Sequence, residues 1–173
     1  MRLLSIIFGL AFHSTHAFSQ NDSTKIVIPM KDGKVFYERS IGTSQIENLT
    51  KTKAGFTEWS KHSFPDSKES VVKADKEKNM VFGTGVFKIV TSESGNYYWM
   101  KFNWRYLDGR FQAYDFYEKP IEKGISNEYS KIEYRWWDFR QGKPWSAEDQ
   151  KLFTGIETGM NTFLSTIENY LGK

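Results

Sequence analysis

The chain has 173 residues, with 24 lysines and arginines, 21 aspartates and glutamates, and no cysteine. This length predicts one domain, and the lack of cysteine excludes a disulfide-stapled scaffold and any cysteine-based metal or redox site. A formal net charge of +3 argues against a chain built to coat nucleic acid or an anionic membrane.

Residues 1–19 have the pattern of a signal peptide. Arg2 gives a positively charged start, residues 3–12 form an apolar run, and Ala17-Phe18-Ser19 is a small-x-small cleavage site. The apolar run is too short to span a bilayer, which needs about 20 residues. An uncleaved anchor and a buried helix are the alternatives. We expect an exported protein, periplasmic or extracellular, that is not an integral membrane protein.

The segment before the predicted core is mostly polar. Residues 20–33 contain a short apolar stretch that ends at Pro29, which predicts a tether or an edge strand. Residues 34–41 follow Gly33 and are rich in β-forming side chains. They predict the first core strand.

A first helix is predicted to end near Pro65, because proline stops a helix. Two starts are open. Ser44 has capping-box spacing to the glutamate three residues later, whereas Thr50 lies nearer the periodic segment. Lys51 argues against Thr50, because a helix that begins there would have positive charge at the positive end of its dipole.

A hairpin is predicted from residues 69–75 and 80–90, joined by the polar loop 76–79. Gly83 and Gly85 are two residues apart and therefore share one face of the second strand. Because they carry no side chains, that face allows another backbone or a helix to approach closely.

Residues 96–118 are the stretch around which we expect the fold to be organised. Two alternating runs flank Asp108-Gly109, a pair that favours the type I′ turn of a two-residue hairpin loop. Such a turn sets the register, so one face is predicted to be core and the other to meet water. The predicted core-face pairs are Leu107 with Arg110, Tyr106 with Phe111, Trp104 with Ala113, Phe102 with Asp115, and Met100 with Tyr117.

Asp115 is the unusual member of the predicted core face. An unpaired carboxylate opposite Phe102 would be costly to bury. We therefore expect Asp115 to lie at the sheet margin near water or to accept hydrogen bonds from a loop or helix start. A structural role is favoured over a catalytic one.

The outward face of the same hairpin is the candidate ligand or partner face. Aromatic rings beside amide and cationic groups offer stacking area, hydrogen bonds and charge without a deep pocket. An ordinary solvated face, with cationic stems lying over the rings, is an alternative. The candidate residues are Trp99, Lys101, Asn103, Arg105, Gln112, Tyr114 and Phe116.

Residues 119–145 form an aromatic-rich insertion before the last helix. A loop of this length in a compact domain is usually functional or holds an extra short element, and residues 130–139 are a candidate strand. Alternatively, the segment folds back and covers the outward face. Its candidate aromatic cover is Tyr134, Trp136, Trp137 and Phe139.

The C-terminal helix is predicted to begin after Ser146, with Asp149 as its capping-box partner. Its apolar residues recur at three- and four-residue spacing and predict a stripe packed on the sheet. They are Leu152, Phe153, Ile156, Met160, Phe163, Leu164, Ile167, Tyr170 and Leu171.

The predicted order is strand, helix, four strands, helix. It indicates an α+β domain over residues 34–173, in which both helices pack on one face of an antiparallel sheet. A helix-grip arrangement is the alternative.

Several short motifs follow one another in this order: Gly33-Lys34-Val35-Phe36, Trp59 with Phe64, Asp75-Lys76-Glu77, Val81-Phe82-Gly83-Thr84-Gly85-Val86-Phe87, Asp108-Gly109-Arg110-Phe111, and Tyr114-Asp115-Phe116. With these motifs the chain resembles a secreted bacterial family of unknown function whose members have a TATA-box-binding-protein-like (TBP-like) fold. The resemblance covers residues 28–118 and implies that fold, with the first helix starting at Thr50. It implies no activity or ligand, and residues 119–145 depart from the family's pattern.

The sequence offers few parts for catalysis. After residue 19 the chain has a single histidine, His62, and no cysteine, so a zinc site lacks ligands and no nucleophile motif is present. We expect no enzyme, no cofactor, no metal and no nucleic-acid partner. The leading hypothesis is a non-catalytic binding module of the bacterial cell envelope that takes a protein, a peptide or a small amphipathic ligand. The alternative is a carrier of a small hydrophobic ligand in a cavity between the sheet and the C-terminal helix.

Overall fold

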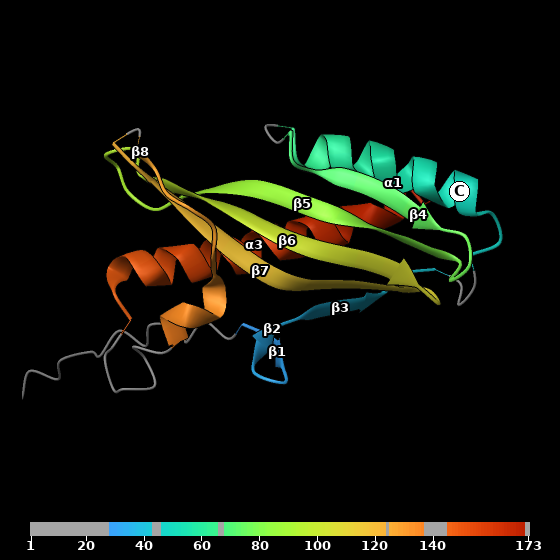
Figure 1. Cartoon of the computed structure of the whole chain (residues 1–173), viewed down its shortest axis with the longest axis horizontal. Helices are drawn as coiled ribbons and strands as arrows, with labels where there is room; N and C mark the ends of the chain where they lie inside the picture. The colour runs from blue at the N-terminus through green and yellow to red at the C-terminus, as the bar shows by residue number, and fades with distance from the viewer. Residues whose placement is uncertain (1–27, 43–45, 66–67, 124, 137–144, 172–173) are drawn as a thin grey trace, which may run out of the picture.

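The computed structural model describes residues 28–42, 46–65, 68–123, 125–136 and 145–171, and the predicted signal peptide lies outside them. An antiparallel sheet with two long helices gives the predicted α+β arrangement (Figure 1). The sheet order is β3-β7-β6-β5-β4, so β3, the first of these strands along the chain, pairs with β7, the last. The strands are β3 (Tyr37–Ser40), β4 (Val71–Asp75), β5 (Met80–Val90), β6 (Tyr97–Leu107) and β7 (Arg110–Glu122).

Both hairpins of the sequence analysis form. β4 and β5 pair with Asp75 opposite Met80, and β6 and β7 pair with Leu107 opposite Arg110. Asp108 and Gly109 have φ values of +49° and +72°, as a type I′ turn requires.

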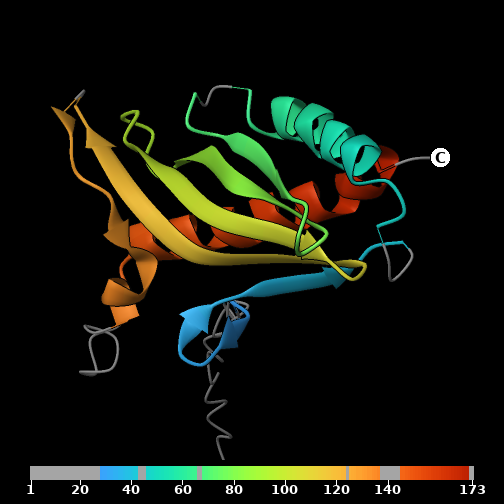
Figure 2. The same cartoon turned by 45° about the vertical axis from the view of Figure 1, so that its right-hand side comes forward.

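The first predicted strand is broken in two. β1 (Met30–Lys31) and β2 (Lys34–Val35) form a small hairpin of their own, and β3 then begins at Tyr37 and pairs with β7. Phe36 marks the break, where its N–H donates to the carbonyl of Pro29 at 3.0 Å. The β1–β2 hairpin projects beside the β3 edge of the sheet (Figure 2).

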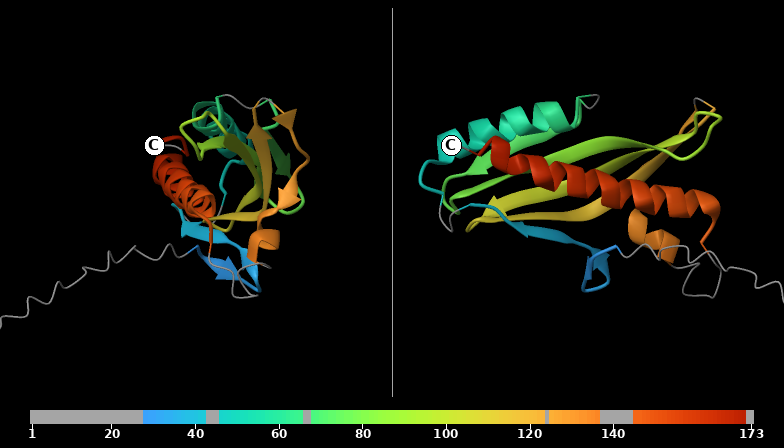
Figure 3. Two further views of the ribbon diagram at one scale, coloured as in Figure 1. Left: turned by 90° about the vertical axis from the view of Figure 1, so that its left-hand side faces the viewer. Right: turned by 180° about the vertical axis from the view of Figure 1, so that it is seen from behind.

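The helices α1 (Leu49–Ser63) and α3 (Ala147–Thr166) lie on the same face of the sheet, as predicted (Figure 3, right). Both predicted starts of α1 are wrong, because Asn48 is the N-cap and its side chain accepts from the N–H of Lys51 at 2.9 Å. The helix ends before Pro65 as expected. In α3 the capping box of Ser146 and Asp149 is present. Within the described ranges, no helix is long and apolar enough to cross a bilayer.

The core lies between the sheet and the two helices. Phe56 and Trp59 of α1 pack on Trp104 of β6, with ring centroids 5.0 and 5.7 Å away. Trp59 also donates its Nε1 to the carbonyl of Phe163 at 3.2 Å, which joins α1 to α3. Fully burying a side chain such as that of Phe56 contributes about 1.5–3 kcal/mol to the stability of the fold. The core stripe of α3, as predicted, includes Leu152, Phe153, Ile156, Met160 and Leu164.

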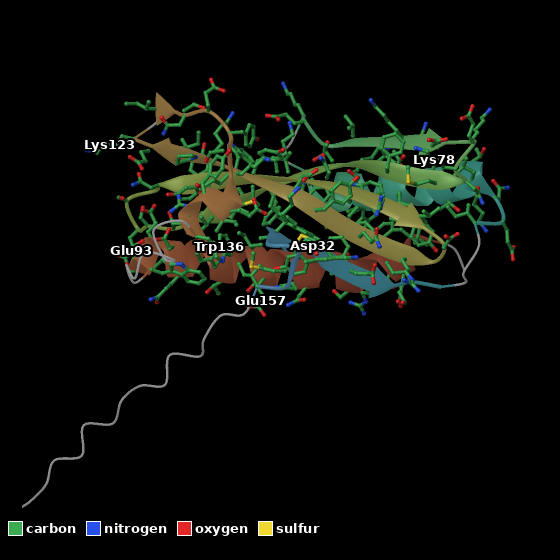
Figure 4. All side chains as sticks on the ribbon, turned by 60° about the horizontal axis from the view of Figure 1, so that its bottom comes forward. Asp32, Lys78, Glu93, Lys123, Trp136 and Glu157 are labelled. Atoms are coloured by element: carbon green, nitrogen blue, oxygen red, sulfur yellow. The ribbon has the colours of Figure 1, made fainter. Side chains whose placement is uncertain are left out.

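Beyond β7 the described residues 125–136 form short elements, and of the strand predicted over 130–139 only Ser130–Lys131 forms in its described part, residues 130–136. β8 (Ile125–Ser126) and β9 (Ser130–Lys131) both pair with β7, and the 3₁₀ helix η1 (Ile132–Tyr134) follows. A second 3₁₀ helix, η2 (Ile167–Asn169), continues α3. Figure 4 places Lys78, in the β4–β5 loop, and Lys123, just past β7, at opposite ends of the sheet.

Candidate functional site

The predicted outward face of the β6–β7 hairpin exists, with one exception. Trp99, Lys101, Asn103 and Arg105 alternate with core residues along β6. Asn103 lies opposite Tyr114 and Arg105 opposite Gln112, as the turn register predicts. The assignment of Phe116 to this face is wrong, since Phe116 is fully buried.

Phe116 lies in the core because β7 carries one extra residue. The register shifts between Lys101 and Asn103, so that Phe102 faces both Asp115 and Phe116. Asp115 has a φ of +52°, in the left-handed region that aspartate tolerates better than most residues. Past this bulge the predicted pairing is displaced by one residue, and Phe116 stacks on Phe102 with centroids 5.3 Å apart.

Asp115 is therefore not on the core face. It is half-buried beside Tyr114, and its carboxylate lies 3.4 Å from the side-chain amide nitrogen of Asn103. The donor is Asn103 of strand β6 and not a loop or helix start as expected, but the half-buried position spares the carboxylate burial without a partner.

The polar groups of the outward face bind one another. Arg105 donates its Nε to Gln112 at 2.6 Å, and Gln112 in turn donates to Glu38 of β3. The Arg105 guanidinium also lies 5.5 Å from the ring centroid of Tyr114. This arrangement fits the alternative in which cationic side chains lie over the rings of a solvated face.

Tyr129 covers part of the same face, a residue that the sequence analysis missed. The Nζ of Lys101 lies 5.2 Å and that of Lys119 4.8 Å from its ring centroid. Lys101 also forms an ion pair with Glu69 at 3.3 Å. Burial raises the pKa of Tyr129 to about 12, and Glu69 adds to the shift.

The aromatic insertion packs elsewhere. Trp136 lies beside α3, with its ring 5.0 Å from that of Phe153 and 5.9 Å from that of Trp145, so it does not cover the outward face (Figure 4). Tyr134 is 66% exposed. Trp137 and Phe139 lie outside the described residues.

An ion cluster ties this insertion to the sheet and to α3. Arg135 pairs with Glu118 of β7 at 2.6 Å and with Asp149 in the first turn of α3. Burial raises the pKa of Glu118, and the nearby Arg135 offsets this only in part. For Asp149, burial alone would raise the pKa, but hydrogen bonds from Ser146 and Arg135 outweigh it and hold the pKa below its usual range. Because each charged group has a partner, we interpret the cluster as structural: it holds the insertion against β7 and α3.

His62 has a structural environment. Its Nδ1 lies 2.9 Å from the carbonyl oxygen of Glu58, one turn earlier in α1, and its ring is 5.4 Å from that of Tyr170. Among the described residues, no group of three or more His, Cys, Asp or Glu side chains is placed to hold a metal ion.

A large hollow in the described part of the molecule is a groove between α3 and β5. It has a volume of about 950 Å³. One wall is the C-terminal half of β5 with Trp99, another is α3, and the C-terminal end of α1 closes one end. The lining residues are Ser63, Phe64, Pro65, residues 86–90, Trp99, Ala147, Gln150, Lys151, Thr154, Gly155, Thr158, Gly159, Thr162 and Phe163.

Two helix glycines allow α3 to lie close to β5 at this groove. A Cβ at Gly155 would come within 2.3 Å of the Cγ2 of Ile89, and one at Gly159 within 2.8 Å of the Cε2 of Phe87. These positions are one turn apart, so they form a smooth strip that faces β5. The Gly-x-x-x-Gly spacing in the last helix was the sequence signal for this close contact, and the sequence analysis did not use it.

The groove has an apolar base and polar rims. Phe87 and Ile89 are buried, whereas Lys88 and Val90 are exposed, with Val90 at 60%. The α3 rim is hydroxyl-rich and exposed, through Thr154, Thr158 and Thr162. The groove is therefore a trough on the surface and not an enclosed cavity.

A smaller hollow lies at the predicted face itself. It has a volume of about 330 Å³ and forms where the β1–β2 hairpin meets Arg105, Tyr114 and Asp115. Its remaining lining residues are Lys31, Asp32, Lys34, Val35 and Phe36.

Comparison with known proteins gives similarity of fold. No family model and no curated protein matches the chain. A TBP-like protein from Parabacteroides distasonis ATCC 8503 is similar in structure, with a TM-score of 0.50, 18% identity, and coverage of 83% of this chain and 98% of that one. A DUF4468 family protein from Bacteroides ovatus ATCC 8483 has a TM-score of 0.54 and 15% identity, over 84% of this chain and 91% of that one. At these identities the likeness concerns the fold alone, and it confirms the predicted TBP-like α+β class.

Proposed function

We propose that this chain is an exported, non-catalytic binding module of the bacterial cell envelope, and that its ligand occupies the groove between α3 and β5. The observation that carries the proposal is the groove itself, with its apolar base of Phe87 and Ile89 and its exposed polar rim. Concave apolar surfaces with a few polar groups are the usual form of ligand sites.

The charge at the groove favours a ligand with an acidic group. Lys88 and Lys151 line it, and among the described residues of its lining there is no aspartate or glutamate. An amphipathic ligand would bury its apolar part against the base of the groove and place an anionic group near these lysines. The outward face of the β6–β7 hairpin is the less favoured site, because its side chains already bind one another.

Export and the lack of catalysis belong to the same proposal. The signal-peptide pattern of residues 1–19 supports export, and intact-mass measurement of the protein from its source cells should find a chain that begins near Gln20. A cytoplasmic chain that keeps Met1 would contradict export. His62 and the charged groups of the Arg135 cluster already have hydrogen-bond or ion-pair partners within the protein, which supports a non-catalytic role.

The test uses an amphipathic anionic dye, anilinonaphthalene sulfonate, added to the folded protein. We expect dye fluorescence to rise at protein concentrations where circular dichroism reports an intact fold. Thr158→Trp fills the groove from an exposed position on α3 and should abolish the rise. The matched control is the triple change Lys101→Ala, Arg105→Ala and Tyr114→Ala, which alters the outward face and should leave dye binding intact.

Loss of dye binding in the triple variant, with binding kept in Thr158→Trp, would move the site to the outward face. A folded protein that binds no dye would overturn the groove as a ligand site.

A carrier of a small hydrophobic molecule is the second candidate, and one observation favours it. The groove lies between the sheet and the C-terminal helix, where the carrier hypothesis expects a cavity. The exposed rim of the groove favours the binding module over the carrier, because carriers enclose most of an apolar ligand. Native mass spectrometry of protein taken from its own cells separates the two. A retained lipid-sized mass would support the carrier, and a co-purifying peptide or protein the module.

A further inference from the structure

The edge of the sheet at the groove carries unpaired backbone. β5 extends from Met80 to Val90, but β4 pairs with it only from Met80 to Thr84. The rest of β5 is bonded to β6 on one side, and within the described residues no strand lies on the other. On that side β5 therefore has no neighbouring strand over about half of its length.

The direction of the free backbone groups follows from strand alternation. The N–H of Val86 points away from β6, because it donates to the Oγ of Ser70 at 3.1 Å. Backbone groups two residues apart along a strand point to the same side. Lys88 and Val90 therefore direct their N–H and C=O groups away from β6, into the groove that their side chains line. Among the described residues, neither N–H has a hydrogen-bond partner.

On these grounds, and resting on the proposed function of the groove, we propose that the ligand is an extended acidic peptide that adds to β5 as a further strand. An added strand would continue the sheet where β4 stops, and backbone hydrogen bonds to Lys88 and Val90 would hold it. Because Ser70 already accepts from the N–H of Val86, the free edge covers residues 87–90, which at about 3.4 Å per residue accommodate about four peptide residues.

The side chains of the groove set the chemistry of such a peptide. On the inner side, its alternate side chains would meet Phe163 and the threonine rim of α3, which favours small apolar or β-branched residues. On the outer side it would meet Lys88, whose Nζ lies 4.0 Å from the ring centroid of Tyr97. Lys88 and Lys151 line the groove without a carboxylate among its described lining residues, and so favour aspartate or glutamate in the peptide.

Val90 offers a sharp test, because a proline there removes one free N–H without removing a bond to β6. Proline is tolerated at the open side of an edge strand. The probe is a fluorescein-labelled octapeptide of alternating valine and threonine that ends in two aspartates, measured by fluorescence anisotropy with the full-length chain. We expect Val90→Pro to weaken binding about tenfold or more, and Val90→Ser, which keeps the N–H, to change it by less than about threefold.

Two further arms keep the test decisive if Val90→Pro fails to fold. The same octapeptide with alternate amides N-methylated cannot pair as a strand and should not bind the wild-type protein. The double change Lys88→Glu and Lys151→Glu should weaken the acidic peptide about tenfold and restore binding to the same peptide with lysines in place of its aspartates.

Equal binding of the N-methylated and parent peptides, or equal affinity of Val90→Pro and wild type, would overturn strand addition. If no peptide binds while the dye still does, the peptide class is wrong and the groove remains a ligand site. Concentration-dependent dimers in light scattering that Val90→Pro abolishes would make the occupant a second copy of this chain, and would likewise overturn the peptide proposal.

Discussion

The guanidinium of Arg135 lies 2.6 Å from the carboxylate of Glu118 and also pairs with Asp149, so one side chain joins the aromatic insertion, the last long strand and the first turn of α3. Its ring contact with Tyr98, 5.0 Å from the centroid, adds β6 to the same joint. The described part of the aromatic insertion is thus fixed to the core by charge as well as by the packing of Trp136.

Replacement of Arg135 by methionine should destabilise the protein by about 2–4 kcal/mol. The change keeps most of the side-chain volume but leaves Glu118, whose side chain is 8% exposed, without its cation. Urea unfolding followed by circular dichroism measures the loss. Arg110→Met, at the exposed first position of β7, is the control and should change stability by less than about 0.5 kcal/mol. Equal stability of the two variants would mean that the cluster makes no net contribution.

We expect ionised Asp149 to stabilise the folded protein, so that part of its stability is lost in acid. Its pKa is below the usual range in the folded protein. The unfolded chain therefore binds the proton at higher pH, and the stabilisation is present above the unfolded pKa of about 3.9 and lost as the pH falls through the folded value. Asp149→Asn should lower stability at neutral pH by about 1 kcal/mol and flatten its decline below about pH 4.

The measurement is a series of urea unfolding curves over the acid range, with Glu168→Gln as a control at an exposed position after α3. An unchanged acid profile in Asp149→Asn would show that the Asp149 carboxylate is not held in its ionised form.

Glu118 contributes to the pH dependence with the opposite sign. Because burial raises its pKa, its contribution to stability is present below the unfolded pKa of about 4.3 and declines as the pH rises.

At Asp115 the backbone conformation should decide the effect of a substitution. Asp115→Ala loses the contact with Asn103 and places an alanine at a φ of +52°, which should lower stability by about 1–2 kcal/mol. Asp115→Gly loses the same contact without the steric cost and should be the more stable variant. Thermal unfolding of the pair checks this, and an alanine variant at least as stable as the glycine variant would contradict the left-handed bulge.

Gly155→Ala should destabilise the protein although alanine is the better helix former by about 1 kcal/mol. The added methyl would collide with Ile89 and push α3 away from β5, at a cost of about 1–3 kcal/mol beyond the propensity gain. Asn161→Ala, at an exposed position on α3, receives the propensity gain alone and should be neutral or stabilising. Chemical denaturation measures both, and a stabilised Gly155→Ala would mean that the helix does not rest on β5.

Local signals in the sequence were sufficient for much of this architecture. The Asp108-Gly109 turn, the capping box of Ser146 and the proline after α1 act within a few residues, and each predicted element formed. The start of α1 was not predicted: the two candidates were Ser44 and Thr50, whereas the N-cap is Asn48, which lies between them and is of a strong N-cap residue type.

What the sequence analysis missed depends on relations between distant segments. The groove arises because β4 is shorter than β5 and because Gly155 and Gly159 let α3 approach, and neither strand alone shows this. The place of Trp136 depends on Phe153 and Trp145, which only the tertiary fold brings to it. Burial of Phe116 was hidden because Phe116-Tyr117 gives an aromatic residue in either phase of strand alternation.

The extra residue at Asp115 bears on how remote relatives of this chain are to be aligned. Every side chain of β7 after it has exchanged faces relative to a regular strand, which is why Glu118 points inward to Arg135. A relative without this residue would bury the other half of its strand. An ungapped alignment through β7 would then equate inward positions of one protein with outward positions of the other, so a one-residue gap at this point is the natural boundary between the two halves of the strand.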